Sequence, residues 1–524
     1  QHLILFFLLF SLFPLCISLN ILVYLTLVSK SHLDFTSTLV NKLTERGHTV
    51  DLVLGRLNSA IHSNGTHNAR YILTAGFPGA SPWNSLKHAT SPFDLMPDQK
   101  MIFTTSWPSF NHITDQLCHH VLDDSSISSH LSTHSYDIAL ISNYDGCPLA
   151  ISHRFGINRV VAYSSMPTTH FEMIHSGIPN LPAFETDSLH RNIFHLFDHN
   201  IFWHRLKNFI RSVLTMEIDT RTMVRETDIV IRSHYGHDFP SISELGKKVF
   251  YEFANSNLIL EEPRLISQRI KFIGGIAYKR AAEIKDQKFL DILSTPSKGI
   301  VLIIFGSQVA ASHYPSHVIS AFLHSISILK EYTFIWKFDG ELGDIPSNLH
   351  LVDWLPQAEL LQDTRVRAFV SHMGMNSFVE AAFAGVPILA IPLFADQTHN
   401  GMNVARLGNG VLLNKPYITN DTMLDSMAEL LNEERYWKRA KEIAEMLHLH
   451  PENPERTFIE TIEFAARFDN LDSITRLHSW DLHWLQTIGY DIAVFLTLLS
   501  VAVIYTTIRI LTFLFSRSNK QKIA

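Results

Sequence analysis

The chain has 524 residues, too many for a single hydrophobic core, and about two or three domains are expected. Hydrophobic residues make up 46% and charged residues 18%, as in a globular protein that carries additional apolar segments. The net charge of −7 and the absence of a basic run from the body give no attraction to nucleic acid, so no nucleic-acid partner is expected.

An apolar segment opens the sequence. Residues 3–19 read LILFFLLFSLFPLCISL, which is about the length of a signal-peptide core, with the small residue Ser18 near its end. We therefore predict a signal peptide over residues 1–19 and a body that enters the secretory pathway.

A first α/β domain is predicted over residues 20–276. The apolar run 21–29 is typical of a buried strand, the next segment of a helix ending at Gly47, and TVDLVL of a second strand. Residues 185–235, rich in aromatic residues, His and Arg, are expected to add helices. Cys118 and Cys147 lie in this domain, and the sequence leaves open whether they form a disulfide or stay as two free buried thiols.

A second α/β domain is predicted over residues 299–475, after a linker at 277–298 whose charged middle and Ser-Thr-Pro-Ser end suit a connection. Strand-like runs begin with GIVLIIFGS (299–307) and alternate with helical patterns, which indicates a parallel sheet covered by helices. The predicted fold class is thus α/β, with two doubly wound domains facing each other across a cleft.

The C-terminal segment predicts a membrane anchor. Residues 492–508 carry no charge, and we predict a transmembrane helix over 490–515 with a basic cytosolic tail over 516–524. Aromatic residues precede the helix and basic residues follow it, as at the two membrane surfaces: Trp480, Trp484 and Tyr490, then Arg517, Lys520 and Lys522. The body would then lie in the lumen, where the sequons at Asn64 and Asn420 could carry glycans.

One stretch of the second domain concentrates polar residues where a strand passes into a helix. FVSHMGMNSFVEAAFAGVP (369–387) places His372 at the carboxyl end of a strand, where open α/β sheets bind ligands. Gly374 permits a close backbone approach, and the helix that follows directs unpaired N–H groups at an anion such as a diphosphate. Asn376, Ser377 and Glu380 share one helical face, and Glu380 suits a ribose.

Three further short segments are expected at the same edge of the sheet. Ser307 follows a Gly turn and offers a hydroxyl to phosphate oxygens. Trp354 and Gln357 supply an aromatic face and an amide for a base. Asp396 and Gln397 end another strand and can bind sugar hydroxyls.

The run from 354 to 410, with WLPQ, FVSHMGMNSFVEAAFAGVPILAIPLFADQ and GNG in order, resembles the signature of the UDP-glycosyltransferase family, including the membrane-bound UDP-glucuronosyltransferases of invertebrate or nematode type. The resemblance implies a GT-B fold of two Rossmann-like domains, with the donor nucleotide on the second and the acceptor on the first. It implies that Trp354 stacks on uracil with Gln357 beside it, that Glu380 binds the ribose, and that Asp396 and Gln397 face the sugar. The diphosphate would be held by Ser307, His372, Gly374, Asn376 and Ser377. One departure is Met373, where the family commonly has Gly, and a positive φ there would cost about 1 kcal/mol.

For the acceptor side, the resemblance places the catalytic base at His32, which follows the first strand. The base needs an orienting carboxylate. The family position for this carboxylate holds Ser142 here, so we assign the role to Asp145, three residues later, and expect Asp137 to start the strand. The implied reaction is an inverting displacement at the anomeric carbon, with no cofactor and no metal, since the sequence contains no Asp-x-Asp triplet.

The main prediction is an endoplasmic-reticulum, single-pass type I membrane enzyme that moves glucuronate or glucose from UDP to a hydroxyl of a small lipophilic acceptor. One alternative is a non-catalytic type I membrane binding protein that keeps the fold, to which Met373 and Ser142 give weight. Another is a UDP-sugar epimerase on the same fold. The sequence does not name the sugar, the acceptor or the oligomeric state, and a homo-oligomer stays open.

Overall fold

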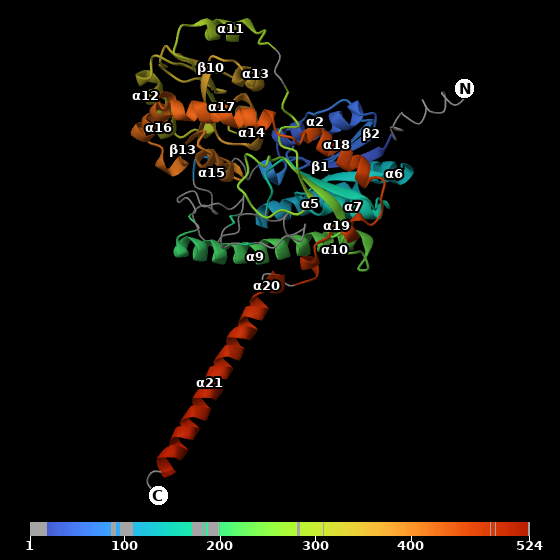
Figure 1. The fold of residues 1–524 in the computed structure, drawn as a ribbon. Helices are drawn as coiled ribbons and strands as arrows, with labels where there is room; N and C mark the ends of the chain where they lie inside the picture. Colours follow the sequence, from blue (N-terminus) through green and yellow to red (C-terminus); the bar gives the residue numbers. More distant parts are fainter. Residues whose placement is uncertain are drawn as a thin grey trace, which may run out of the picture.

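Two parallel β-sheets, each covered by helices, form the body, and one long helix projects away from it (Figure 1). The computed structural model describes residues 18–84, 91–94, 108–169, 181, 185–186, 198, 200–279, 283–307, 309–482, 484–487 and 489–521. The predicted signal peptide therefore lies almost entirely outside the described residues, and so do residues 522–524 of the predicted basic tail.

The first sheet has the strand order β3-β2-β1-β4-β5-β6-β7, and every neighbouring pair is parallel. Its third strand in this order, β1, reads NILVYLT and is buried almost throughout, as a parallel strand covered on both faces requires. Ile21 in this strand pairs with Val50 on one side and Ile138 on the other. The strands are β1 (Asn20–Thr26), β2 (Thr49–Arg56), β3 (Tyr71–Gly76), β4 (Ile138–Ser142), β5 (Val160–Ser164), β6 (Val249–Ala254) and β7 (Ile270–Phe272).

Helices of the first domain follow the predicted βαβ opening. α2 starts after the N-cap Ser29, whose side chain accepts a hydrogen bond from the His32 N–H, and the chain turns out of the helix at Gly47 with a φ of +96°. Cys118 and Cys147 form a disulfide, so the bridge is the correct one of the two alternatives. The helices are α2 (Lys30–Glu45), α5 (Pro108–Asp123), α6 (Ser125–Thr133), α7 (Cys147–Arg154), α9 (Phe202–Tyr235) and α10 (Ile242–Gly246).

The second sheet has the order β10-β9-β8-β11-β12-β13, again all parallel. Its strands are β8 (Ile300–Ile304), β9 (Thr333–Lys337), β10 (Leu349–Val352), β11 (Val366–Ser371), β12 (Ile388–Ala390) and β13 (Gly410–Leu412). Its helices are α11 (Gln287–Ser294), η1 (Ala311–His313), α12 (Ser316–Ile328), α13 (Gln357–Leu361), α14 (Met375–Ala384), α15 (Gln397–Leu407), η2 (Lys415–Tyr417), α16 (Asn420–Asn432) and α17 (Glu434–His448).

The domain boundaries differ from the predicted ones at two places. The predicted linker at 277–298 contains α11, whose Phe289 and Ile292 are buried in the core of the second domain. α18 (Pro454–Ala465) and α19 (Leu471–Thr475), which we assigned to the second domain, return to the first one, because Phe458 and Ile462 pack in its core. Hydrophobic periodicity shows that such a helix has an apolar face, but it does not show which sheet that face covers.

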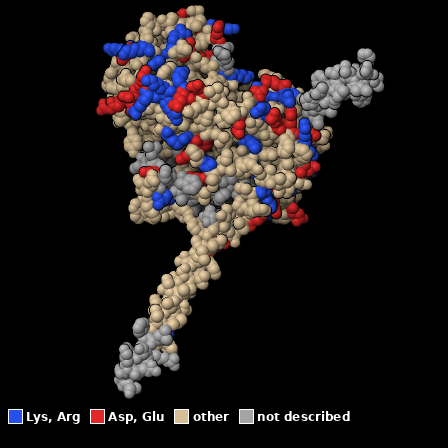
Figure 2. Space-filling view, viewed as in Figure 1, with Lys and Arg blue, Asp and Glu red and all other residues tan. Residues whose placement is uncertain are grey.

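The C-terminal segment leaves the body as a single helix. After η3 (His478–Asp481) and α20 (Trp484–Thr487), α21 runs from Tyr490 to Gln521. Its part from Tyr490 to Phe513 is long and apolar enough to cross a membrane, and no part of it is buried against the body. Figure 2 shows this projecting helix almost without charged side chains, in contrast to the mixed surface of the body. The helix is a candidate for the predicted anchor.

Candidate active site

His372 lies at the centre of the carboxyl edge of the second sheet, directly after β11. Two glycines leave room for its ring: a Cβ added to Gly306 would lie 2.7 Å from His372 Nε2, and one added to Gly374 would lie 2.8 Å from it. Gly306 follows β8 with a φ of +73°, and Gly374 is the N-cap of α14. The imidazole therefore sits between the end of one strand and the start of a helix, where the sequence predicted it.

The surroundings of His372 favour an anion. Gly374 has no side chain to cap α14, so the N–H groups of the first helical turn stay available to a ligand. Burial lowers the pKa of His372 to about 4, so its imidazole is neutral and can donate or accept a hydrogen bond. Lys337 lies close by and donates a hydrogen bond to the Gly306 carbonyl at 2.7 Å. Ser307 is exposed at the same turn, so its hydroxyl is accessible.

Met373 adopts the strained conformation that the sequence raised as a concern. Its φ is +70°, in the left-handed region, and its side chain is fully buried in the second-domain core. The surrounding structure holds this backbone: the Met373 N–H donates to Ser371 Oγ at 3.1 Å, and its carbonyl accepts from Asn400 Nδ2 at 2.9 Å. The core packing of the side chain explains how Met is accommodated at a cost of about 1 kcal/mol.

The residues predicted to bind the uracil base and the ribose come together on α13 and α14. Gln357 Nε2 donates to Ser377 Oγ at 3.1 Å and to Glu380 Oε2 at 2.7 Å. Burial, with a smaller contribution from the charge of Glu359, raises the pKa of Glu380 to about 7. Trp354 is 68% exposed and offers its ring face to a ligand. Such a large exposed aromatic side chain, three residues before Gln357, is typical of a binding site rather than of a core.

Asp396 and Gln397 begin α15 and are both buried. The Asp396 carboxylate accepts a hydrogen bond from Asn400 Nδ2 at 2.8 Å, and burial raises its pKa to about 7. Gln397 Oε1 accepts from the backbone N–H groups of Leu393 and Phe394 at 2.9 and 3.1 Å. The carbonyl oxygen of Gln397 is thus engaged by the chain, which leaves its Nε2 group to donate to a ligand.

Asn376 connects the second domain to the first. Its Oδ1 accepts a hydrogen bond at 2.9 Å from Asn255 Nδ2, at the carboxyl end of β6. A second contact between the domains is the buried ion pair of Glu261 with His399 of α15, to which Ser256 and Arg264 add a hydrogen bond and a further charge. The carboxyl edges of the two sheets are therefore held against each other by polar contacts.

His32 lies in the first turn of α2, just after β1. Its Nδ1 is buried and has no hydrogen-bond partner among the described residues, and burial lowers its pKa to about 4. Its ring stacks on Tyr144, with the ring centroids 4.8 Å apart and the planes 17° from parallel. The imidazole is neutral at physiological pH and can accept a proton.

Asp145 does not orient His32 in this structure. Its carboxylate accepts hydrogen bonds from Thr26 Oγ1 and, at 2.8 Å, from the Cys147 N–H, and burial raises its pKa to about 6. Ser142 Oγ, at the position where the family has its carboxylate, accepts from the Thr26 N–H at 3.0 Å. Both side chains therefore serve the end of β1 instead of the imidazole. Asp137 precedes β4, as predicted.

Sequence reasoning missed Asn255, Tyr144 and Asn400. Asn255 directly follows β6, so the rule that ligands bind at the carboxyl ends of parallel strands could have found it. Tyr144 lies in the loop after β4, where a carboxylate was sought, and a stacking ring gives no pattern in sequence. Asn400 is four residues after Asp396 on one helical face, which is a spacing that the sequence does show.

A comparison with known protein families matches almost the whole chain. The family model "UDP-glucoronosyl and UDP-glucosyl transferase" matches residues 21–523. The chain belongs to this family.

Two relatives illustrate the similarity to other members of the UDP-glucuronosyl and UDP-glucosyl transferase family. Putative UDP-glucuronosyltransferase ugt-50 of Caenorhabditis elegans is 25% identical over 500 residues, which cover 92% of each chain. UDP-glucuronosyltransferase 3A2 of Homo sapiens is 27% identical over 398 residues, covering 74% of this chain and 73% of the relative.

Solved structures show the fold. The glycosyltransferase of kitacinnamycin superposes with a TM-score of 0.60 at 17% identity, covering 86% of this chain and 99% of the other. A UDP-glucosyltransferase from Polygonum tinctorium superposes with a TM-score of 0.55 at 16% identity, covering 86% of this chain. The predicted GT-B fold is confirmed, and the protein is a UDP-glycosyltransferase, as the main prediction held over its two alternatives.

Proposed function

We propose that the protein transfers a glucuronosyl or glucosyl group from UDP to a hydroxyl of a small lipophilic acceptor, with inversion at the anomeric carbon. His32 takes the proton of the acceptor hydroxyl, the acceptor oxygen forms a bond to the anomeric carbon, and the bond from that carbon to the β-phosphate oxygen breaks. UDP leaves with the electron pair.

One observation carries this proposal: the uncapped start of α14 stands beside the neutral ring of His372 and the open backbone of Gly306 and Gly374. Partial positive charge at a helix N-terminus stabilises an anion without a proton change. We assign the departing diphosphate to this place, so that its charge is balanced by the helix and not by a metal.

The other contacts to the donor are assigned to residues at the same carboxyl edge of the second sheet. The exposed Trp354 takes the uracil ring, Glu380 takes the ribose hydroxyls, and Asp396 with Gln397 takes the sugar. Ser307, Asn376 and Ser377 border the diphosphate. The acceptor class rests on the family resemblance, because much of the chain that precedes α5 and α9 lies outside the described residues.

The test is thermal unfolding of the full chain in detergent, titrated with UDP, UDP-glucuronate and UDP-glucose. A ligand at about a hundred times its Kd adds roughly 2.7 kcal/mol, which raises the unfolding temperature measurably. Stabilisation by UDP, and more by one sugar nucleotide than the other, supports the proposal and identifies the donor. A folded protein that responds to none of the three would contradict it.

We further propose a single-pass type I topology in the endoplasmic reticulum, with the body in the lumen. The apolar helix at Tyr490–Phe513 and the disulfide between Cys118 and Cys147 support it, since disulfides persist in oxidising compartments. Glycans at Asn64 and Asn420 would report this orientation. Both asparagines are exposed.

A further inference from the structure

A continuous set of contacts runs from His32 in the first domain to Asn376 in the second. The His32 ring stacks on Tyr144, and the Tyr144 hydroxyl bonds to Ser165 twice, at 2.5 Å to its Oγ and at 3.0 Å from its N–H. The Ser165 carbonyl then accepts from Asn255 Nδ2 at 3.0 Å, and the same amide group donates to Asn376 Oδ1 at 2.9 Å.

We propose that Tyr144 is the positioning residue of His32, and that the contacts through Ser165 and Asn255 fix the base relative to the donor half of the site. This inference rests on the proposed function, in which His32 is the base and Asn376 borders the diphosphate. It assigns to an aromatic ring the orienting role that sequence reasoning gave to a carboxylate.

The surroundings of the imidazole leave this role to Tyr144. Ser142 and Asp145 both bind Thr26, and Asp145 also binds the Cys147 N–H. Lys30 and Asp34, on the same helix as His32, pair with each other on the surface. No charged group among the described residues shifts the pKa of His32, which is set by burial alone. The parallel stack with Tyr144 is thus the contact that fixes the plane of the ring.

Burial of these contacts helps to keep His32 at a fixed position relative to the second domain. Tyr144 is 9% exposed, Ser165 is 6% exposed and Asn255 is 3% exposed, so the hydrogen bonds among these three residues are shielded from water. The bond from Asn255 to Asn376 is partly buried. Shielded bonds hold their partners more firmly than exposed ones. A misplacement of about 1 Å in a catalytic group can cost on the order of a hundredfold in rate. A shift of either domain would therefore change the distance from the base to the sugar.

Three variants separate these contacts. Tyr144→Leu keeps an apolar side chain but removes both the stack and the hydroxyl, whereas Tyr144→Phe removes the hydroxyl alone. The matched control is Tyr136→Phe, because Tyr136 also donates a partly buried hydrogen bond in this domain, to Asp51 at 2.7 Å, but lies at the amino end of β4, whereas His32 follows the carboxyl end of β1.

The first readout needs no substrate. Diethyl pyrocarbonate modifies neutral imidazole, so its rate at His32, followed by peptide mass spectrometry from pH 5 to 8, reports the exposure and the pKa of that ring. The wild type and Tyr136→Phe should react slowly and at a rate that hardly changes with pH, because the pKa of His32 is about 4. Tyr144→Leu should react faster, with a midpoint near the ordinary value of about 6.5. A profile like that of the wild type would overturn the proposal.

The second readout is transfer to the phenol 4-methylumbelliferone. We expect Tyr144→Leu to lower kcat by about 10- to 100-fold and to shift the acid limb of the pH profile of kcat/KM to higher pH. Tyr144→Phe should lower kcat by roughly three- to tenfold with the acid limb unchanged. A role in folding alone would lower the yield or the unfolding temperature and leave both the kcat of the folded enzyme and its pH profile as in Tyr136→Phe.

The link to the donor half is tested by combining Tyr144→Phe with Asn255→Ala. If the contacts act as one unit, the double variant loses less kcat than the product of the two single losses. Independent losses would restrict the role of Tyr144 to its own domain and overturn that part of the proposal. UDP binding, measured by thermal shift, should persist in every Tyr144 variant. If the wild type itself does not bind UDP, the proposed function is rejected, whatever the reaction with diethyl pyrocarbonate shows.

Discussion

Asn400 donates a hydrogen bond to the Met373 carbonyl at 2.9 Å and holds in place a buried side chain whose backbone has a φ of +70°. The same amide nitrogen also donates to Asp396, at 2.8 Å. A strained residue of the proposed diphosphate turn and an acidic residue of the proposed sugar site are thus fixed by one side chain.

The strain at Met373 can be measured by two substitutions. Met373→Ala should lower the free energy of unfolding by about 2–5 kcal/mol, because it leaves a cavity in the core. Met373→Gly removes slightly more of the side chain but also removes the left-handed strain, and we expect it to be about 1 kcal/mol more stable than Met373→Ala. Denaturant unfolding of both variants makes the comparison, and a glycine variant less stable than the alanine one would contradict it.

Glu380 should make UDP binding depend on pH. Its pKa is raised to about 7, chiefly by burial. In the proposed site the ionised carboxylate accepts hydrogen bonds from the ribose hydroxyls more strongly than the neutral acid does, so the affinity for UDP should fall as the pH is lowered through 7. Glu380→Gln should bind about 10- to 100-fold more weakly, since hydrogen bonds to charged groups are worth about 1.5–3 kcal/mol. Calorimetric titration at several pH values makes the measurement.

Two comparisons sharpen this test. Ionisation of UDP itself is common to all variants, so the pH dependence that disappears in Glu380→Gln belongs to the carboxylate. Glu359→Gln removes a neighbouring charge that raises the pKa of Glu380, and it should bind UDP normally with its midpoint at a lower pH. An unchanged pH profile in Glu380→Gln would show that Glu380 does not contact the ribose.

The buried pair of Glu261 and His399 should stabilise the contact between the domains. Glu261→Gln should lower the free energy of unfolding by about 3–5 kcal/mol, because it leaves buried partners without their counter-charge. The partners, foremost the His399 charge, hold the pKa of Glu261 well below its usual value. The stability from this carboxylate is therefore present above a pH of about 4.5 and is lost as the pH falls further.

A surface pair serves as the control for Glu261. Glu434 lies 2.8 Å from Lys438 with both side chains exposed, and Glu434→Gln should leave the free energy of unfolding almost unchanged. Denaturant unfolding at pH 7 compares the two variants, and equal losses would mean that the buried pair contributes no more than a surface one.

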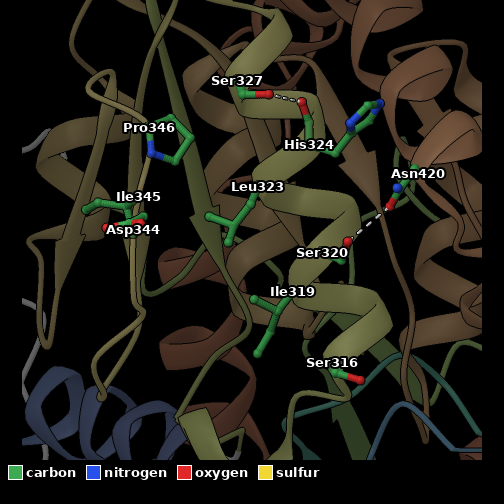
Figure 3. A pocket seen from close by; sticks show the side chains of 10 residues that line it. All are labelled: Ser316, Ile319, Ser320, Leu323, His324, Ser327, Asp344, Ile345, Pro346 and Asn420. Carbon is green, nitrogen blue, oxygen red and sulfur yellow. Dashed lines mark hydrogen bonds between the residues drawn. The ribbon is translucent and has the colours of Figure 1, made fainter.

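The orientation of the body can be read from its sequons. Asn420 lies beside α12, at the edge of a shallow groove lined by Ile319, Leu323 and Pro346 (Figure 3). Both Asn420 and Asn64 are exposed. A lumenal body should carry glycans, so endoglycosidase treatment should lower the apparent mass, and Asn64→Gln with Asn420→Gln should abolish that change. If the apparent mass of the microsomal protein does not change on treatment with the endoglycosidase, the proposed lumenal orientation loses its support.

Much of the fold, and the place of the candidate site residues within it, could be predicted from the sequence, because the information is local. The apolar strand runs, the glycines Gly306 and Gly374 that follow β8 and β11, and the polar residues at His372 and Glu380 lie within short segments whose geometry is set by neighbouring residues. The GT-B architecture then followed from the family resemblance.

The rest depends on contacts between distant segments. The return of Phe458 to the first core, the hydrogen bond from Asn255 to Asn376 and the stacking of Tyr144 on His32 each join residues that are far apart in the chain. Asp145 is a further example. It lies near the expected place in the sequence, but its carboxylate accepts a hydrogen bond from Thr26, which is distant in the chain.

The disulfide between Cys118 and Cys147 should support the loop that carries Tyr144 and Asp145. It closes a loop of 29 residues, for which chain entropy predicts a stabilisation of about 3.6 kcal/mol. Cys118→Ala and the double variant Cys118→Ala with Cys147→Ala should lose the same amount, because either change removes the bridge. Denaturant unfolding with and without a reducing agent makes the measurement, and the reductant should affect the wild type alone. Losses that add from one variant to the next would mean that the two cysteines stabilise the fold by packing and not as a bridge.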